Sequence, residues 1–124
     1  MTTVPAVNAE GLAKRFGATQ ALRGLDLRIR PGEIYGLLGP NGSGKTTFIR
    51  CVAGLLRPEA GTLTVLGGAP RAAVSAGRVG YMTQTPALYG DLSVNENLRF
   101  FAALQGMPRA YDRIAEALRT VDLR

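Results

Sequence analysis

The chain has 124 residues and a net charge of +6, with 46% apolar and 19% charged residues. This composition is ordinary for one small folded domain and too apolar for a disordered chain. One cysteine and no histidine exclude an internal disulfide, a multi-cysteine metal cage and histidine-based catalysis. No apolar run is long enough to cross a bilayer and no signal peptide is evident, so we expect a cytosolic chain.

The first half of the chain alternates strand patterns with one helix. Residues 25–30 alternate apolar and charged side chains, which predicts a strand with one solvated face. Residues 34–38 form a continuous apolar run, typical of a strand covered on both sides in a parallel sheet. Apolar residues then recur at helical spacing, and Pro58 predicts the end of that helix; they are Phe48, Ile49, Val52 and Leu55.

Two further strands and a short helix follow. Residues 62–65 alternate again and predict a strand, whereas residues 71–75 predict a short helical stretch. Residues 78–83 hold Val79, Tyr81 and Met82, which favours a strand that ends before Pro86. We therefore expect mixed strand and helix up to about residue 85.

The remainder of the chain is predicted to be helical. Ser93 and Glu96 have the spacing of a capping box, in which each residue's side chain bonds the other's backbone N–H group. Residues 106–108 are Gly-Met-Pro and break the pattern. A second amphipathic helix is indicated by apolar residues at i, i+3, i+4 and i+7, namely Ile114, Ala117, Leu118 and Val121.

A glycine-rich segment lies between the apolar run and the first helix. It matches G-x-x-x-x-G-K-[ST] at every fixed position: Gly39, Pro40, Asn41, Gly42, Ser43, Gly44, Lys45, Thr46 and Thr47. Such a loop turns successive backbone N–H groups toward a triphosphate, at the positive end of a helix dipole. We expect Lys45 to reach the β- and γ-phosphates, Thr46 to place its hydroxyl on Mg²⁺, and Thr47 to lie toward the α-phosphate.

Nearly the whole chain resembles the N-terminal part of the ATP-binding subunit of ATP-binding-cassette (ABC) transporters. The segments that carry the resemblance include the loop and its flanks, residues 12–17, 21–27, 32–47, 53–55, 58–61, 80–84 and 92–98. The resemblance implies an α/β fold, with a P-loop NTPase core and an antiparallel β-subdomain over residues 1–88. Residues 89–124 would then begin an α-helical subdomain.

The resemblance also implies roles for residues outside the loop. Phe16 occupies the position of the aromatic residue that stacks on adenine. Gln84 occupies the position of a glutamine that contacts Mg²⁺ and the attacking water. The catalytic residues would thus be Lys45 and Gln84, and the Mg²⁺ ligands Thr46 and Gln84. Asp91, Glu96 and residues 94–104 fall in the region that meets the membrane-spanning partner, although helix capping alone accounts for Glu96. Cys51 is expected to be a small buried apolar residue.

The family pattern continues with features that this chain does not contain. An apolar strand ending in paired acids, a catalytic glutamate, a signature segment and a switch histidine are all absent from the sequence. We therefore expect the front half of a larger domain, truncated before those features. Such a chain would bind ATP and Mg²⁺ weakly and hydrolyse ATP negligibly by itself.

Three functions fit these residues. The first is the ATPase of a transporter, of export type, that acts with a transmembrane permease subunit and a second ATP-binding domain in a homo- or heterodimer. It would lie in the cytoplasm on the inner face of the cell membrane. The second is a soluble ABC ATPase of translation or DNA repair, and the third is a nucleotide-binding remnant without catalysis. The positive charges are scattered, so we expect no nucleic-acid partner.

Overall fold

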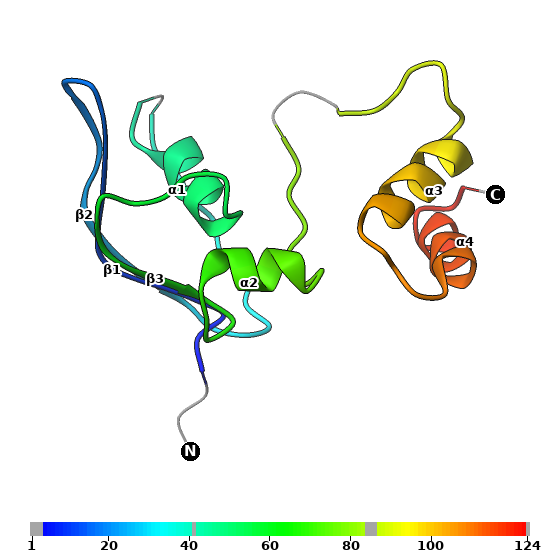
Figure 1. Ribbon diagram of the computed structural model, residues 1–124, viewed down its shortest axis with the longest axis horizontal. Coiled ribbons are helices and arrows are strands. Elements are labelled where there is room, and N and C mark those ends of the chain that lie inside the picture. Colours follow the sequence, from blue (N-terminus) through cyan, green and yellow to red (C-terminus); the bar gives the residue numbers. More distant parts are fainter. Residues whose placement is uncertain (1–3, 41, 84–86, 124) are drawn as a thin grey trace. The chain divides into compact units, whose positions relative to one another are not determined.

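The computed structural model describes residues 4–40, 42–83 and 87–123 (Figure 1). The contacts between residues divide the chain into two compact units, Met1–Tyr81 and Met82–Arg124. The expected domain boundary after residue 88 stays a prediction.

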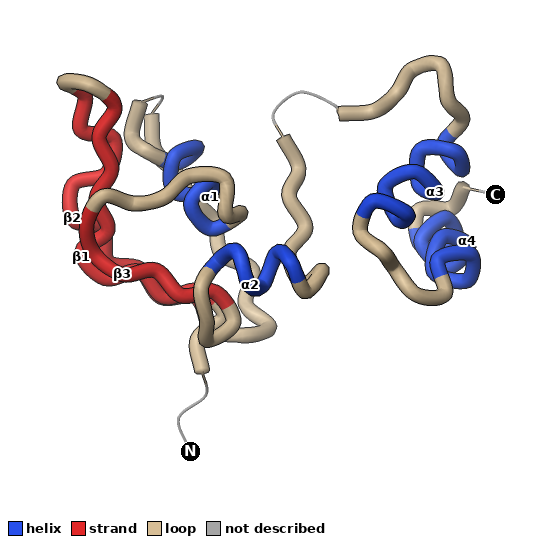
Figure 2. Tube along the Cα trace, in the orientation of Figure 1, coloured by secondary structure: helices blue, strands red, loops and turns tan. Residues whose placement is uncertain are grey.

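The first unit contains an antiparallel sheet. Its strands are β1 (Val7–Phe16), β2 (Thr19–Ile29) and β3 (Ala60–Val65), in the order β2-β1-β3. Figure 2 shows them in red. β1 and β2 form a hairpin around a two-residue turn in which Gly17 has a φ of +59°, a conformation that glycine adopts without strain. The strand predicted over residues 25–30 is confirmed in β2 as far as Ile29, and the strand predicted over residues 62–65 is confirmed within β3.

The predicted alternation along β2 is present. Leu22 is buried, and Leu25 and Leu27 are half-buried on the same side, where they contact the core. Asp26 and Arg28, the residues on either side of Leu27, are exposed. One face of the sheet is therefore apolar and covered, and the other faces solvent.

The register of β1 shifts near Gly11, where the sheet has an irregularity against both neighbours. Asp26 accepts a 2.7 Å hydrogen bond from the Gly11 N–H group, which pairs a backbone donor that the ladder leaves out. On the other side, Gly61 has a φ of +83°, and a Cβ there would collide with the Gly11 carbonyl oxygen. Gly61 thus lets β3 approach β1 at the irregularity.

Helix α1 (Lys45–Val52) covers the apolar face of the sheet. Phe48 and Cys51 are almost fully buried against residues of β1 and β2, and the cluster consists of Ala9, Leu12, Leu22, Phe48 and Cys51. Burial raises the pKa of the Cys51 thiol, and the nearby charge of Lys14 partly opposes that rise. The prediction that Cys51 is a buried apolar residue is confirmed. A short helix, α2 (Pro70–Ser75), follows β3 at the predicted position.

Helix α1 ends earlier than the position of Pro58 led us to predict. Gly54 has a φ of +75° and donates its N–H group to the Cys51 carbonyl, and Leu55 donates to the Arg50 carbonyl. This pair of bonds is a Schellman motif, which ends a helix at a left-handed glycine. The helix therefore stops at Val52, and Leu55 lies in the turn that follows, with 59% of its surface exposed.

The strands predicted over residues 34–38 and 78–83 are wrong for this structure. Neither segment is part of a strand, and Ile34 and Leu38 are 101% and 97% exposed, while Leu37 alone of that run packs against the core. A buried parallel strand requires hydrogen-bonded neighbours at its edges. Among the described residues, the sheet contains only β1, β2 and β3, so these apolar runs have no neighbour to pair with.

The second unit contains α3 (Val94–Leu104) and α4 (Ala110–Thr120). The predicted capping box is confirmed: Glu96 N–H donates to the Ser93 hydroxyl at 3.1 Å, and Ser93 N–H donates to the Glu96 carboxylate at 2.9 Å. The backbone bond from Ser93 is the main reason that the pKa of Glu96 is lowered. The predicted break at residues 106–108 falls between the two helices.

Asn97 fixes the segment that leads into α3. Its side chain is buried, with the residue only 6% exposed. Its amide donates to the carbonyls of Tyr89, Leu92 and Ser93 at 2.9–3.2 Å and accepts from the Tyr89 N–H group at 2.9 Å. One side chain therefore supplies the partners that this non-regular segment needs.

Replacing Asn97→Ala is expected to lower the free energy of unfolding by about 2–3 kcal/mol, because four part-buried hydrogen bonds to the backbone are lost. Urea unfolding followed by circular dichroism measures the change. Asn95→Ala is the matched control, since Asn95 is exposed on the same helix. Equal stability of the two variants would contradict this role of Asn97.

A candidate phosphate-binding site

The glycine-rich loop leads directly into the N-terminus of α1 (Figure 1). Gly44 is the residue before the helix and has a left-handed conformation, with φ 95° and ψ 4°. Phe48 N–H donates to the Gly44 carbonyl at 2.9 Å, which closes the first helical turn. The first N–H groups of an α-helix point out of its N-terminus, where they attract an anion.

Gly44 lies against the backbone of β2. A Cβ at this position would be 2.6 Å from the Ala21 carbonyl oxygen and 2.9 Å from the Leu22 side chain. Only glycine combines this close approach with a positive φ. The loop is also tightly folded on itself, because Ser43 N–H donates to the Pro40 carbonyl at 3.2 Å and a Cβ on Gly39 would meet the Ser43 hydroxyl at 2.9 Å.

Lys45 spans the loop from its C-terminal end. Its ammonium group donates a hydrogen bond to the Gly39 carbonyl, the first residue of the motif. The cation is thus held over the same loop whose N–H groups would bind phosphate. Thr46 and Thr47 follow on the first turn of α1, and both are partly buried. The structure places the predicted residues from Gly42 to Thr47 at the start of α1, whereas Asn41 lies outside the described residues.

A pocket of about 540 Å³ opens beside the loop. Its walls are two residues of the loop, Gly42 and Ser43, and a stretch of β2, namely Gln20, Ala21, Leu22, Arg23, Gly24 and Leu25. No spacing in the sequence indicated that β2 contributes to the site. β2 reaches the site because Gly44 packs closely against Ala21, a residue that lies outside the sequence motif.

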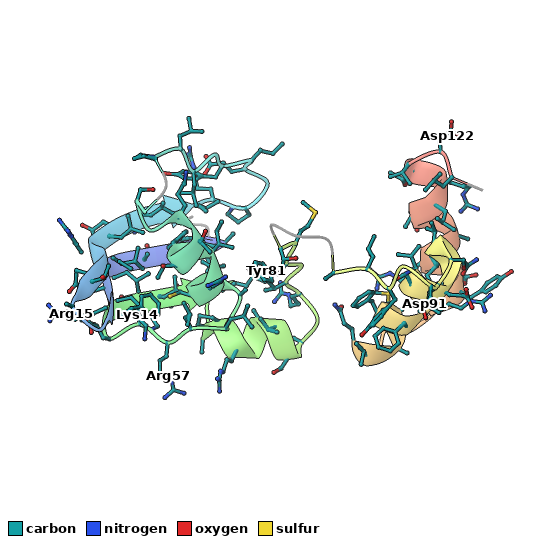
Figure 3. All side chains as sticks on the ribbon, turned by 90° about the horizontal axis from the view of Figure 1, so that it is seen from above. Lys14, Arg15, Arg57, Tyr81, Asp91 and Asp122 are labelled. Atoms are coloured by element: carbon teal, nitrogen blue, oxygen red, sulfur yellow. The ribbon has the colours of Figure 1, made fainter. Side chains whose placement is uncertain are left out.

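Phe16 lies at the hairpin end of β1, beside the turn. Its side chain is 46% exposed, and the Lys14 ammonium lies 5.5 Å from the centre of its ring, a distance at which a cation is attracted to the ring face. Figure 3 shows Lys14 and Arg15 at this end of the sheet. Among the described residues, those that line the pocket do not include Phe16.

The donor set of the loop fits a metal that arrives with a nucleotide. Within the described residues, no three His, Cys, Asp or Glu side chains lie close enough together to hold a metal ion. Mg²⁺ commonly keeps several waters and binds through substrate phosphates with one or two protein oxygens, and the Thr46 hydroxyl can be one of them. The predicted ligand Gln84 lies outside the described residues.

This fold and site define a class of protein: one that binds a phosphorylated ligand in a glycine-rich loop at a helix N-terminus. The family model described as ABC transporter matches residues 22–124. The chain belongs to that family, so the resemblance seen in its sequence is confirmed.

Curated relatives match most of the chain. It is 43% identical over 122 residues to the daunorubicin resistance ATP-binding protein DrrA3 of Streptomyces coeruleorubidus, covering 95% of the chain and 39% of that relative. It is 42% identical over 113 residues to the Nod factor export ATP-binding protein I of Ralstonia nicotianae, covering 87% and 34%. It is 38% identical over 120 residues to the sulfate/thiosulfate import ATP-binding protein CysA of Thermosynechococcus vestitus, covering 94% and 36%.

Solved structures confirm the expected fold class. An ATP-binding subunit of an ABC transporter matches 87% of the chain and 46% of its own, with a TM-score of 0.74 and 30% identity. Clostridium perfringens cbiO1, part of the ABC transporter complex cbiONQ, is similar in fold over 97% of the chain and 51% of its own, with a TM-score of 0.82 and 24% identity. The chain spans between a third and two fifths of the three curated relatives above. None of the helices described here has the length and apolar character needed to cross a membrane.

Replacing Gly44→Ala is expected to weaken binding of inorganic tripolyphosphate and to lower the free energy of unfolding by about 1–3 kcal/mol, because the new Cβ is strained and collides with Ala21. Calorimetric titration and urea unfolding measure the two effects. Gly36→Ala is the control, since a Cβ there meets nothing within 4 Å. If Gly44→Ala behaved like Gly36→Ala, the close approach would be irrelevant to the site.

Proposed function

We propose that this chain is the nucleotide-binding part of an ABC transporter subunit that uses ATP binding and hydrolysis to drive export across a membrane. The observation that carries the proposal is the loop itself, in which Lys45 bridges to Gly39 and Gly44 packs on β2 at the start of α1. Family membership supports ATP as the phosphorylated ligand.

Each part of ATP has a proposed partner. The loop N–H groups and Lys45 bind the phosphates, Thr46 contributes a hydroxyl to the Mg²⁺ that the phosphates carry, and Thr47 lies toward the α-phosphate. Phe16 stacks on the base, for which its exposed ring is suited. Gln84 is proposed to contact Mg²⁺ and the attacking water.

The names of the relatives support a proposed assembly and a proposed direction of transport. Two of them, at 42% and 43% identity, are named for Nod factor export and for daunorubicin resistance. An importer subunit follows at 38%. We therefore propose export, with a transmembrane permease subunit and a second ATP-binding domain as partners. The subunit would lie on the cytoplasmic face of the membrane through that permease.

Lys45→Ala is expected to weaken binding of ATP with Mg²⁺ roughly 10- to 100-fold, because hydrogen bonds to charged groups contribute about 1.5–3 kcal/mol. Isothermal titration calorimetry of the purified protein measures the dissociation constants. Arg50→Ala is the control, because it removes an exposed cation from the same helix without touching the loop. Equal affinity of wild type and Lys45→Ala would overturn the proposed phosphate site.

Hydrolysis by this 124-residue chain is expected to be negligible even where ATP binds. The acids after residue 84 are Asp91, Glu96, Asp112, Glu116 and Asp122, and they lie on the helices or next to them. The sequence contains no apolar strand ending in paired acids, which is where the family pattern has the carboxylate that polarises water at the phosphates. Release of phosphate from ATP measures the rate. Turnover that disappears in Lys45→Ala would show that the chain carries a sufficient catalytic set.

A further inference from the structure

We propose that Gln20 is a positioning residue for the base of the nucleotide: its side-chain amide holds the hairpin end that carries Phe16. This rests on the proposed function, in which Phe16 stacks on the base. Gln20 belongs to neither the loop motif nor any residue set that the sequence indicated.

The sheet narrows where Phe16 lies. β3 pairs with β1 only as far as Ala13, which faces Ala60. Beyond that point β1 pairs with β2 alone, through Arg15 and Gln20 to Phe16 and Thr19. A two-stranded hairpin is marginally stable by itself in water, so the orientation of Phe16 depends on contacts other than the ladder.

The amide of Gln20 supplies such contacts on both sides. Its oxygen accepts a 2.9 Å hydrogen bond from Nε of Arg15, directly across the hairpin. Its nitrogen donates to the Leu22 carbonyl at 2.8 Å and to the Glu59 carboxylate at 3.2 Å. Both amide protons and one acceptor position are therefore used within the protein, which leaves Gln20 suited to orienting its neighbours.

Glu59 connects this end of the hairpin to the body of the unit. It lies just before β3, in the segment that follows the end of α1, and its N–H group donates to the Ala13 carbonyl at 2.9 Å. Gln20 thus links three segments: β1 through Arg15, β2 through its own backbone, and the segment before β3 through Glu59. These hydrogen bonds stabilise the hairpin end at the point where β3 no longer pairs with β1.

Gln20 also lies where a ligand that extends from the glycine-rich loop would pass. It lines the same pocket as Gly42 and Ser43 of the loop. A ligand anchored by its phosphates at Ser43 and extending along β2 reaches Gln20 and the hairpin end next. A change in the orientation of Phe16 should therefore weaken binding of the base of the nucleotide and leave binding of its phosphates unchanged.

The test compares two ligands on one variant. Gln20→Met keeps the length of the side chain and removes the amide. We expect its affinity for ATP with Mg²⁺ to fall roughly three- to tenfold, as for the loss of a few partly exposed hydrogen bonds. Its affinity for inorganic tripolyphosphate, which has no base, should stay that of the wild type. Calorimetry of the purified protein gives both dissociation constants.

Two controls isolate the amide of Gln20. Thr19→Ala alters an exposed residue at the same hairpin end, and Gln105→Met makes the same chemical change at the exposed end of α3. Both should bind the two ligands as the wild type does. Unchanged ATP affinity in Gln20→Met, or an equal loss for ATP and tripolyphosphate, overturns the positioning role. A wild type that binds tripolyphosphate but not ATP would instead overturn the base site itself, and one that binds neither would overturn the proposed function.

Discussion

The contact between Gly44 and the Ala21 carbonyl is the constraint on which the rest of the site depends. It requires a residue without a Cβ, in a left-handed conformation, immediately before α1. Leu22 takes part twice, since its side chain lies beside Gly44 and also belongs to the core with Phe48 and Cys51. The packing that holds α1 on the sheet therefore also determines how closely the glycine-rich loop approaches β2.

The proposed sites for the phosphates and for the base of the ligand differ in how firmly the surrounding structure holds them. The loop rests on a helix whose inner face is fully packed, whereas Phe16 lies where the sheet has only two strands. Packed side chains resist displacement because any shift loses many small contacts at once. Hydrogen bonds at a part-exposed hairpin end are weaker and compete with water. The proposed phosphate site is thus stiff, whereas the proposed base site depends on polar side chains for its orientation.

Sequence reasoning succeeded where the signal is local. The alternation in β2, the capping box of Ser93 and Glu96, and the loop motif before α1 each involve residues a few positions apart. It failed for residues 34–38, because an apolar run shows that a segment favours burial without showing that strands are present to pair with it. The contribution of Gln20 was invisible because its partner Glu59 is 39 positions away. The end of α1 at Val52 is also set by a local signal, Gly54, but the prediction rested on Pro58 instead.

The position of Lys45 explains how the loop keeps a cation close to its own backbone. Its ammonium is paired with the Gly39 carbonyl, so it is neither free to move into solvent nor bound to an acid that a phosphate would have to displace. An incoming phosphate exchanges a neutral acceptor for a charged one, and charge-assisted hydrogen bonds are roughly twice as strong. In the proposed function, the preference of the loop for an anion therefore lies in the difference between these two acceptors.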